Sequence, residues 1–402
     1  MPKKPVSPFA GPDFKNNPYG VYAEIRAEAP VHPAVLPNGV KVFLVTRYPD
    51  VLASLKDDRL VKNIRNARPK GVLGKLGLEL NLNNTNMLRS DPPEHTRLRA
   101  LAHAAFTPKF VSQLRAHVQE IADRLLAAVA PAGQMDLIND YAFPLPITVI
   151  TEMLGVPTAD EQKFRKWSTA IIASGAISSE GTHLVPELLP LVRYVRRLVK
   201  QRTRTPQDDL ISQLIHAEQN GDRFTEREVI GTTILLLIAG HETTVNLIGN
   251  GALALLQAPE QMAKLKQDPG LIKPAVEEML RFVNPVQFVN RYASVDVEIG
   301  GVKVAKGSHL LLVVSAGNHD PAFAAAPDQL DVSHGDAKHL AFGQGIHYCL
   351  GAPLARLEGE IAFTTLLQRL PKLRLADPKA ALQWRPALEL RGLKTLPVIF
   401  ES

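Results

Sequence analysis

The chain contains a single cysteine, Cys349, among its 402 residues. One cysteine excludes an internal disulfide framework, a four-cysteine zinc site and an iron–sulfur cluster held by this chain alone. So little cysteine is typical of proteins that work in a reducing compartment, and we therefore expect a cytoplasmic protein.

The sequence also lacks long apolar runs. The nearest candidate, residues 234–240, is seven residues long and is followed by His241 and Glu242, whereas a membrane-spanning helix needs about 18 to 20 apolar residues. Residues 1–14 are polar and rich in proline, without the apolar run of a signal peptide or an anchor. We expect a soluble protein with no membrane partner.

Long basic runs are absent too, although the formal net charge is +6 and the pI is about 9.3. We find no basic run longer than that of Arg196-Arg197 and no alternation of aromatic and basic residues, which argues against a nucleic-acid interface. Two interpretations of the positive charge remain open. One is a solvated surface, and the other is a basic patch that docks an acidic electron-transfer protein.

What the sequence does contain is an unusual segment around its cysteine. Residues 342–351 read Phe-Gly-Gln-Gly-Ile-His-Tyr-Cys-Leu-Gly, and leucine and isoleucine then recur at helical spacing, with Pro353 in the first turn. Cys349 therefore lies where free backbone N–H groups and the helix dipole are expected to lower the pKa of its thiol. Gly343 and Gly345 allow a tight turn and the close approach of a flat group. An axial haem ligand needs such a thiolate.

This segment resembles the haem-binding signature of the cytochrome P450 family, and each fixed position of that signature matches. The resemblance implies haem b, with Cys349 as the metal ligand. A dinucleotide-binding loop does not fit, because the position of its third glycine is Tyr348. The residues that the resemblance assigns to the haem loop are Phe342, Gly343, His347, Cys349 and Gly351.

A long helix is predicted to begin after Thr225 and to end near Gln257. Thr225 and Glu228 form a capping box, and Pro259 stops the helix. About 32 residues with a rise of about 1.5 Å each give roughly 48 Å, which is enough to cross the whole molecule.

The centre of this helix carries polar residues in apolar surroundings. Residues 239–244 read Ala-Gly-His-Glu-Thr-Thr, and a buried acid beside hydroxyls is unfavourable unless it is used or hydrogen-bonded. Thr243 can donate to a carbonyl one turn earlier and so open a local groove. A zinc-protease motif fails here, because its second histidine would stand at Val245.

The same six residues match the oxygen-activating motif of the P450 family. By resemblance, Thr243 holds dioxygen and a water molecule, and Glu242 relays protons toward them. The resemblance also places Ala239 and Gly240 against the haem.

Another helix is predicted to begin near Asp91, which can cap it, with Glu94 completing a capping box. His95 and Arg99 are four residues apart, so they share one face of this helix. Residues 286–293 read as a strand that carries Arg291. By resemblance, the haem propionates contact four basic residues: His95, Arg99, Arg291 and His347.

The remaining motifs concern structure and substrate. By resemblance, Glu278 and Arg281 form a buried pair that helps to hold the haem region. Residues 62–89 are irregular, which is typical of a lid or binding loop, and by resemblance residues 168–190 form the mobile lid over the substrate. The positions expected to face the substrate are mainly apolar: Leu235, Ala239, Val286, Val289 and residues 390–393.

Together these features predict a mainly α fold with a smaller β-rich region, built as a single domain over residues 1–402 without a fused reductase. The β-rich region is expected to draw on the N-terminus, the strand after Pro285 and the C-terminal tail. Haem would lie between the long helix and the Cys349 loop with its following helix. We expect a monomer.

The predicted activity is a haem-thiolate monooxygenase that inserts one atom of O₂ into an apolar lipid, terpenoid, steroid or polyketide. Its electrons would come from NAD(P)H through a ferredoxin or flavodoxin and its reductase. Two alternatives remain open, a peroxide-driven or non-hydroxylating haem-thiolate enzyme and a haem-based gas-binding protein. A buried Glu242–Thr243 pair argues against both.

Overall fold

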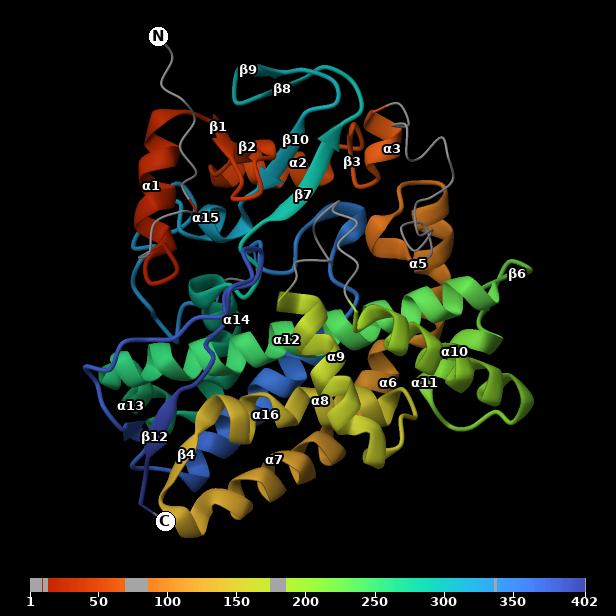
Figure 1. Ribbon diagram of the computed structural model, residues 1–402. Helices are drawn as coiled ribbons and strands as arrows, with labels where there is room; N and C mark the ends of the chain where they lie inside the picture. The colour runs from red at the N-terminus through yellow and green to blue at the C-terminus, as the bar shows by residue number, and fades with distance from the viewer. Residues whose placement is uncertain (1–8, 10–13, 69–85, 174–185, 336–337, 402) are drawn as a thin grey trace.

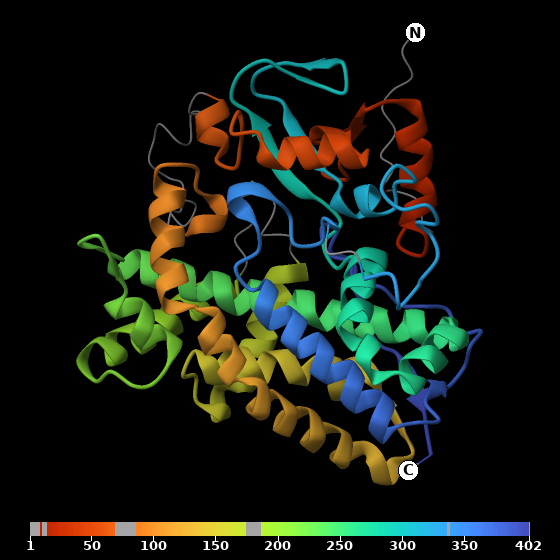
Figure 2. The same cartoon turned by 180° about the vertical axis from the view of Figure 1, so that it is seen from behind.

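The computed structural model describes residues 9, 14–68, 86–173, 186–335 and 338–401. A body of helices fills the lower part of the view in Figure 1, and a sheet with short helices lies above it. Figure 2 shows the same two parts from behind, with α16 and α7 now in front.

The upper part is built on a five-stranded sheet with the order β1-β2-β10-β7-β3. Most neighbours are antiparallel, but β10 runs parallel to β2 and pairs Leu311 with Leu44. The strands are β1 (Val31–Val35), β2 (Lys41–Val45), β3 (Leu60–Val61), β7 (Val289–Ala293) and β10 (His309–Leu312). Around them lie α1 (Pro18–Glu28), α2 (Tyr48–Lys56), α3 (Ile64–Ala67), α15 (Val314–Asn318) and the hairpin of β8 (Val297–Ile299) and β9 (Val302–Val304).

The helical body packs around α12 (Glu226–Gln257), which contacts α8, α10, α14 and α16. The helices of this body are α5 (Glu94–Ala105), α6 (Pro108–Gln113), α7 (Arg115–Val129), α8 (Pro144–Met153), α9 (Glu161–Ala173), α10 (Leu188–Arg204), α11 (Leu210–His216), α13 (Pro259–Gln267), α14 (Ile272–Val283) and α16 (Ala352–Arg369). Two small sheets complete the fold, one of β5 (Glu218–Gln219) and β6 (Asp222–Arg223), and one of β4 (Gln134–Asp136), β11 (Arg374–Leu375) and β12 (Pro397–Ile399).

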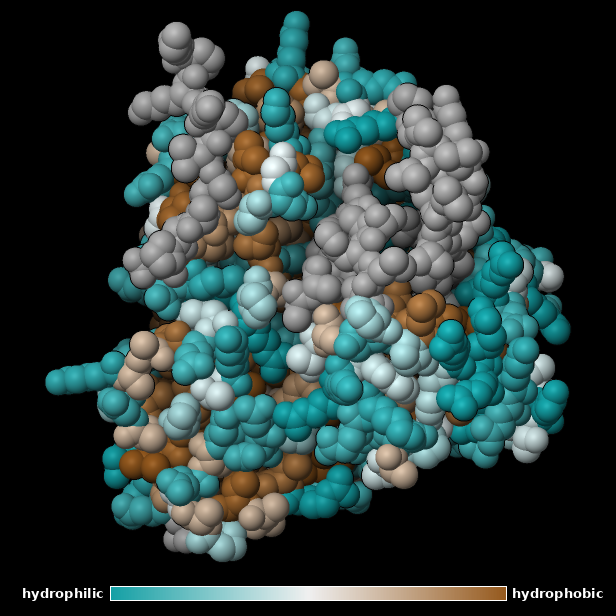
Figure 3. Space-filling model, in the orientation of Figure 1, coloured by the Kyte–Doolittle hydropathy of each residue, from teal (hydrophilic) through white to brown (hydrophobic). Residues whose placement is uncertain are grey.

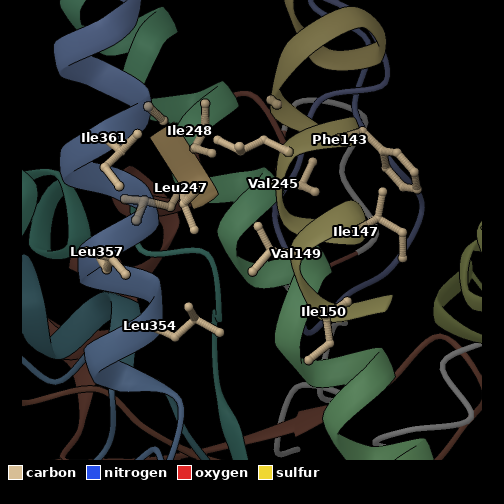
Figure 4. Close-up of a cluster of buried hydrophobic side chains, with 14 of the residues drawn as sticks. Phe143, Ile147, Val149, Ile150, Val245, Leu247, Ile248, Leu354, Leu357 and Ile361 are labelled. Carbon is tan, nitrogen blue, oxygen red and sulfur yellow. The ribbon is translucent and has the colours of Figure 1, made fainter. Parts of the chain in front are cut away.

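The long helix forms as predicted. Thr225 is its N-cap, the capping box with Glu228 is present, and the helix has 32 residues. Its central part is buried between α8 and α16, as Figure 4 shows for Val245, Leu247 and Ile248. Each fully buried aliphatic side chain of this kind stabilises the fold by about 1.5–3 kcal/mol, so packing holds α12 straight through the body.

The mainly α fold with a smaller β-rich region is confirmed. The composition of that β region differs from the expectation, because β12 of the C-terminal tail pairs with β4 and β11 instead of joining the main sheet. The strand after Pro285 begins at Val289, and Val286 makes only an isolated bridge with Leu390. Within the described ranges, no helix is both long and apolar enough to cross a membrane.

Candidate active site

The Cys349 loop is a tight turn that depends on two glycines. Gly343 and Gly345 have φ angles of 68° and 71°, in the region that favours glycine. A Cβ on Gly345 would lie 2.7 Å from the carbonyl oxygen of Leu55 at the end of α2, so a side chain there would collide with backbone. The Cys349 amide donates to the Phe342 carbonyl at 2.9 Å and closes the turn.

The sulfur lies just before α16, whose N-cap is Gly351 and whose first turn contains a proline, as predicted. The expected fall in the pKa of the thiol is wrong: burial raises that pKa, and it outweighs the lowering by the Gly351 and Ala352 amides and by Arg99 and Arg356. Part of Cys349 is nevertheless accessible. We interpret this as a sulfur desolvated by surrounding protein but open on one side, a setting in which a bound metal ion would stabilise the thiolate.

Several cationic side chains gather beside this loop. Burial and the nearby Arg99 lower the pKa of His95 to about 4, and burial together with Arg291 lowers the pKa of Lys62 to about 7. Arg291 itself is buried on β7, and burial lowers its pKa to about 10. Cations crowded together away from water destabilise one another unless an anion joins them.

Two histidines of this cluster are in contact. The rings of His95 and His347 lie 4.3 Å apart between centroids. His95 is buried, and neither of its ring nitrogens has a hydrogen-bond partner among the described residues. Burial, followed by the charge of Arg291, lowers the pKa of His347. Arg99 donates to the Tyr348 carbonyl at 2.6 Å and so joins α5 to the Cys349 loop.

The predicted capping box of α5 is wrong. The helix begins at Glu94 with Pro93 as N-cap and without a side-chain cap. The carboxylate of Asp91 instead accepts hydrogen bonds from the Lys62 and Asn63 amides at 2.7 and 3.0 Å. Asp91 therefore orders the turn that brings Lys62 to the cationic side chains beside the Cys349 loop. Its carboxylate oxygens are not available to cap α5.

The centre of α12 has an accessible side and a buried side. Ala239 is exposed and Thr243 is partly buried, and the Thr243 hydroxyl donates to the Ala239 carbonyl at 3.0 Å, as predicted. The Cβ direction of Gly240 points elsewhere, toward Ile150 of α8 at 3.3 Å. The buried His241 bonds the Leu237 carbonyl at 2.7 Å on the same helix.

Glu242 is buried and bound by a residue that sequence reasoning missed. Arg385 Nη1 donates to both of its carboxylate oxygens, at 2.7 and 2.9 Å. Burial raises the pKa of Glu242, and Arg385 opposes that rise. Backbone contacts hold Arg385 in turn: its amide donates to Gly392 at 2.9 Å and its Nε to Leu393 at 3.2 Å. An isolated arginine 143 residues from its partner leaves no signal in the sequence.

The expected substrate positions divide in two. Leu235, Val286 and Val289 are partly buried, and the Val286–Leu390 bridge brings the two segments together. Residues 391–393, by contrast, are buried and occupied elsewhere: Arg391 Nε donates to the Lys15 carbonyl at 3.1 Å, and a Cβ on Gly392 would overlap Asn246. Much of the two expected mobile loops lies outside the described residues, at 69–85 and 174–185.

Glu278 and Arg281 form a buried, two-pronged pair, with Arg281 Nε and Nη2 donating to the two carboxylate oxygens at 2.7 and 2.8 Å. Arg281 also donates to the carbonyls of Asn318, Pro327 and Gln329. The pair thereby fastens the segment that leads to the Cys349 loop.

A second anchor was not predicted. Glu277 accepts from Arg356 at 2.6 and 2.8 Å and from His339 at 3.1 Å, while Arg356 also contacts the Tyr348 hydroxyl at 3.2 Å. Although burial would raise it, Arg356 and His339 hold the pKa of Glu277 at about 2. Glu277 and Glu278, which are adjacent on α14, therefore hold the segments before and after the Cys349 loop.

Known proteins share this arrangement over almost the whole chain. The chain is 40% identical over 394 residues to Polyketide biosynthesis cytochrome P450 PksS of Bacillus subtilis (strain 168), covering 96% of this chain and 97% of that protein. The chain belongs to the cytochrome P450 family. The family model for Cytochrome P450 matches residues 190–269 and 270–379.

Other comparisons agree with this assignment. The P450 is 42% identical over 392 residues to Cytochrome P450 monooxygenase PikC of Streptomyces venezuelae, covering 96% and 92% of the two chains. The solved structure of PksS superimposes with a TM-score of 0.90 at 38% identity, covering 98% of this chain and 99% of that one. The structure titled P450BioI in complex with hexadec-9Z-enoic acid ligated Acyl Carrier Protein gives 0.89 at 38% identity, covering 97% and 99%.

Membership makes the protein a haem b monooxygenase that draws electrons from NAD(P)H through external redox proteins. The described residues of this P450 fit haem chemically. The unpartnered nitrogens of His95 and the crowded cations around it suit a dianionic group, and the thiol of the exposed residue Cys349 suits an iron ligand. The assignment of each residue to the haem stays a prediction, as do the haem contacts of Phe342, Gly343 and Gly351.

Proposed function

We propose that this P450 hydroxylates or epoxidises an apolar small molecule with one atom of O₂. The observation that carries the proposal is the adjacent acid and alcohol in α12, where the Thr243 hydroxyl donates to the Ala239 carbonyl and the buried Glu242 is the preceding residue. A gas-binding protein has no use for a buried carboxyl group that can relay protons there, whereas O₂ activation consumes protons.

In this proposal, the bound haem supplies O₂ binding and O–O cleavage. Cys349 would hold the iron, and the amides of Gly351 and Ala352, which lower the pKa of its thiol, would stabilise the thiolate. The propionates would be held by five basic residues, Lys62, His95, Arg99, Arg291 and His347, and their negative charge would favour the protonated forms that burial now disfavours.

Proton delivery then falls to Glu242 and Thr243. The Thr243 hydroxyl donates to the helix carbonyl, so its oxygen is left to accept a hydrogen bond from a water beside the substrate. Glu242 is held by Arg385, so a relay requires its carboxyl group to turn from Arg385 toward Thr243. Arg385 thus keeps the acid away from the reaction until a proton is needed.

The partly buried Leu235, Val286 and Val289, with the exposed Ala239, favour an apolar substrate. The names of the relatives suggest two classes, polyketides for PksS and a fatty acyl chain on an acyl carrier protein for P450BioI. We propose one of these for this P450, a monomer of one domain in the cytoplasm, with a ferredoxin or flavodoxin and its reductase as electron source.

The test is a titration of the ferric protein with a fatty acid, a macrolide and a steroid, followed through the spin-state change of the haem spectrum. A compound that shifts the spectrum is then turned over with NADPH, ferredoxin, ferredoxin reductase and oxygen-18 gas. We expect one labelled oxygen atom per product molecule. Product that forms with hydrogen peroxide but never with O₂ and electrons would support the peroxide-driven alternative instead.

A further inference from the structure

The outward face of α10 carries a row of cations. The opposite face of α10 is buried in the core. The sequence of α10 contains no acidic residue. The exposed cations of this row follow helical spacing along one side: Arg193, Arg196, Arg197, Lys200 and Arg204.

These five cations form no ion pair with any residue that the structure describes. Exposed arginines elsewhere do pair, as Arg115 does with Glu360 and Arg369 with Asp123. Like charges three or four residues apart on a helix repel each other and destabilise it slightly. Arg197 lies over the ring of Tyr194, 5.9 Å from its centroid, and, after the hydrogen bond from Lys163, its charge also lowers the pKa of Asp160. Among the described residues, these contacts offset only part of the repulsion within the row.

Two hollows lie along the row. The larger, of about 500 Å³, is lined by side chains of α10 and of the first turns of α12, including Arg196, Lys200 and Arg227. The smaller, of about 320 Å³, lies beside it and shares Lys200. Figure 3 shows hydrophilic side chains gathered on this side of the molecule. Glu226 is the one acid that lines either hollow.

The shape and chemistry of this surface favour a protein helix as its occupant. From Arg193 to Arg204 the row extends about 16 Å, or three turns of a facing helix that bears carboxylates. The exposed Leu189 offers an apolar contact at one end of α10. The one aromatic residue of α10, Tyr194, packs edge-on against Phe164, so no aromatic platform for nucleic-acid bases is present on the described helix.

The position of α10 indicates whether a protein docked there would deliver electrons or a substrate. α12 packs against α10 and also against α16, the helix that follows Cys349; α10 and α16 do not share an extensive contact. We expect an electron donor to dock near the Cys349 loop. α10 instead adjoins the first turns of α12, which lead to Leu235 and Ala239, where we expect the substrate.

We propose that the cationic row of α10, with Arg227, docks an acidic helix of a carrier protein that presents a tethered acyl substrate. This rests on the proposed function, because it assumes an acyl substrate. The complementary charges steer the carrier to the surface, so its binding is expected to weaken steeply with salt.

The test uses the haem-containing full chain and a bacterial acyl carrier protein loaded with a hexadecanoyl group. A triple variant, Arg196→Glu, Lys200→Glu and Arg227→Glu, reverses three cations of the larger hollow. The control variant, Arg124→Glu, Lys303→Glu and Lys379→Glu, makes the same change of net charge at exposed sites elsewhere. We expect the α10 variant to bind the loaded carrier at least about tenfold more weakly at low salt, and the control to bind like the wild type.

Three results would overturn the proposal: no binding of the carrier to the wild type, equal weakening in both variants, or slower reduction by ferredoxin in the α10 variant with carrier binding intact. Titration with free hexadecanoic acid separates this proposal from the proposed function. If the free acid still shifts the haem spectrum and is oxidised, the monooxygenase assignment stands even where carrier docking fails.

Discussion

Arg385, on the C-terminal loop, clamps the carboxylate of Glu242 in the middle of α12, with Nη1 at 2.7 and 2.9 Å from the two oxygens. The exposed fractions of the two side chains are 16% for Arg385 and 1% for Glu242. A buried acid held in this way is charged only as long as the arginine stays. This ion pair therefore affects both the stability of the fold and the proton relay proposed for Glu242.

The change Arg385→Ala should destabilise the protein by about 3 kcal/mol near neutral pH, because it leaves a buried charge unpaired. Burial already raises the pKa of Glu242 in the folded state, and removal of Arg385 raises it further. The folded state then prefers the protonated acid, so stability is lost as pH rises above the ordinary pKa of glutamate. Urea unfolding at pH 5 and pH 8 should show the larger difference from wild type at pH 8.

Two further variants keep this prediction specific. Arg385→Lys restores the positive charge without the planar guanidinium group and should recover part of the lost stability. Glu242→Gln should remove most of the pH dependence of that stability loss. Infrared spectra should show the protonated carboxyl band of residue 242 persisting to higher pH in Arg385→Ala than in wild type. A pH-independent loss of stability in Arg385→Ala would show that the arginine acts through packing alone.

Thr243→Ala should uncouple the enzyme. Without the hydroxyl that now bonds the Ala239 carbonyl, we expect NAD(P)H consumption to continue while product per NAD(P)H falls roughly tenfold and hydrogen peroxide accumulates. The measurement compares NAD(P)H, product and peroxide in one reconstituted reaction. Thr233→Val is the control, because the hydroxyl of Thr233 is buried on the same helix without a hydrogen-bond partner among the residues that the structure describes. Tight coupling in Thr243→Ala would remove Thr243 from oxygen activation.

Lys62 should make the stability of the haem-free protein depend on alkaline pH. Its pKa is lowered from 10.5 to about 7, mainly by burial and then by Arg291. The folded state thus favours the neutral amine, so the free energy of unfolding should rise as pH increases from 7 toward 10. Lys62→Met should flatten this dependence and weaken haem retention, as measured by denaturation and by haem transfer to a scavenger protein. The same pH dependence in Lys62→Met and wild type would contradict the cationic cluster.

Arg281→Ala should remove the anchor behind the Cys349 loop. The variant leaves Glu278 buried without its partner and frees three carbonyl groups, so we expect a loss of about 3–5 kcal/mol. Arg59→Ala, which breaks an exposed pair with Asp57, is the comparison and should cost less than about 1 kcal/mol. Thermal unfolding of both variants, followed with haem absorbance, checks the difference. Equal losses would show that the buried pair has no special structural role.

Features encoded in short stretches were predictable from the sequence. The capping box of Thr225 and Glu228, the glycine turn before Cys349 and the Thr243 contact one turn back all depend on residues within a few positions of one another. Local hydrogen bonding and backbone preference are sufficient to specify such features.

Features that depend on tertiary packing were not predictable from the sequence. Arg385 and Lys62 reach the site from loops far away in the chain, and nothing in their own surroundings marks them. Asp91 has the residue type of a helix cap, but its carboxylate binds the amides of another segment. The pKa of Cys349 was misjudged for a related reason, since burial outweighs the local helix terminus.

The optical spectrum of the reduced protein, with and without carbon monoxide, tests whether Cys349 binds haem iron as a thiolate. We expect a strongly red-shifted Soret band in the wild type that is lost in Cys349→Ser. A band at the position of histidine-ligated haem in the wild type, or a red-shifted band that survives Cys349→Ser, would contradict this assignment.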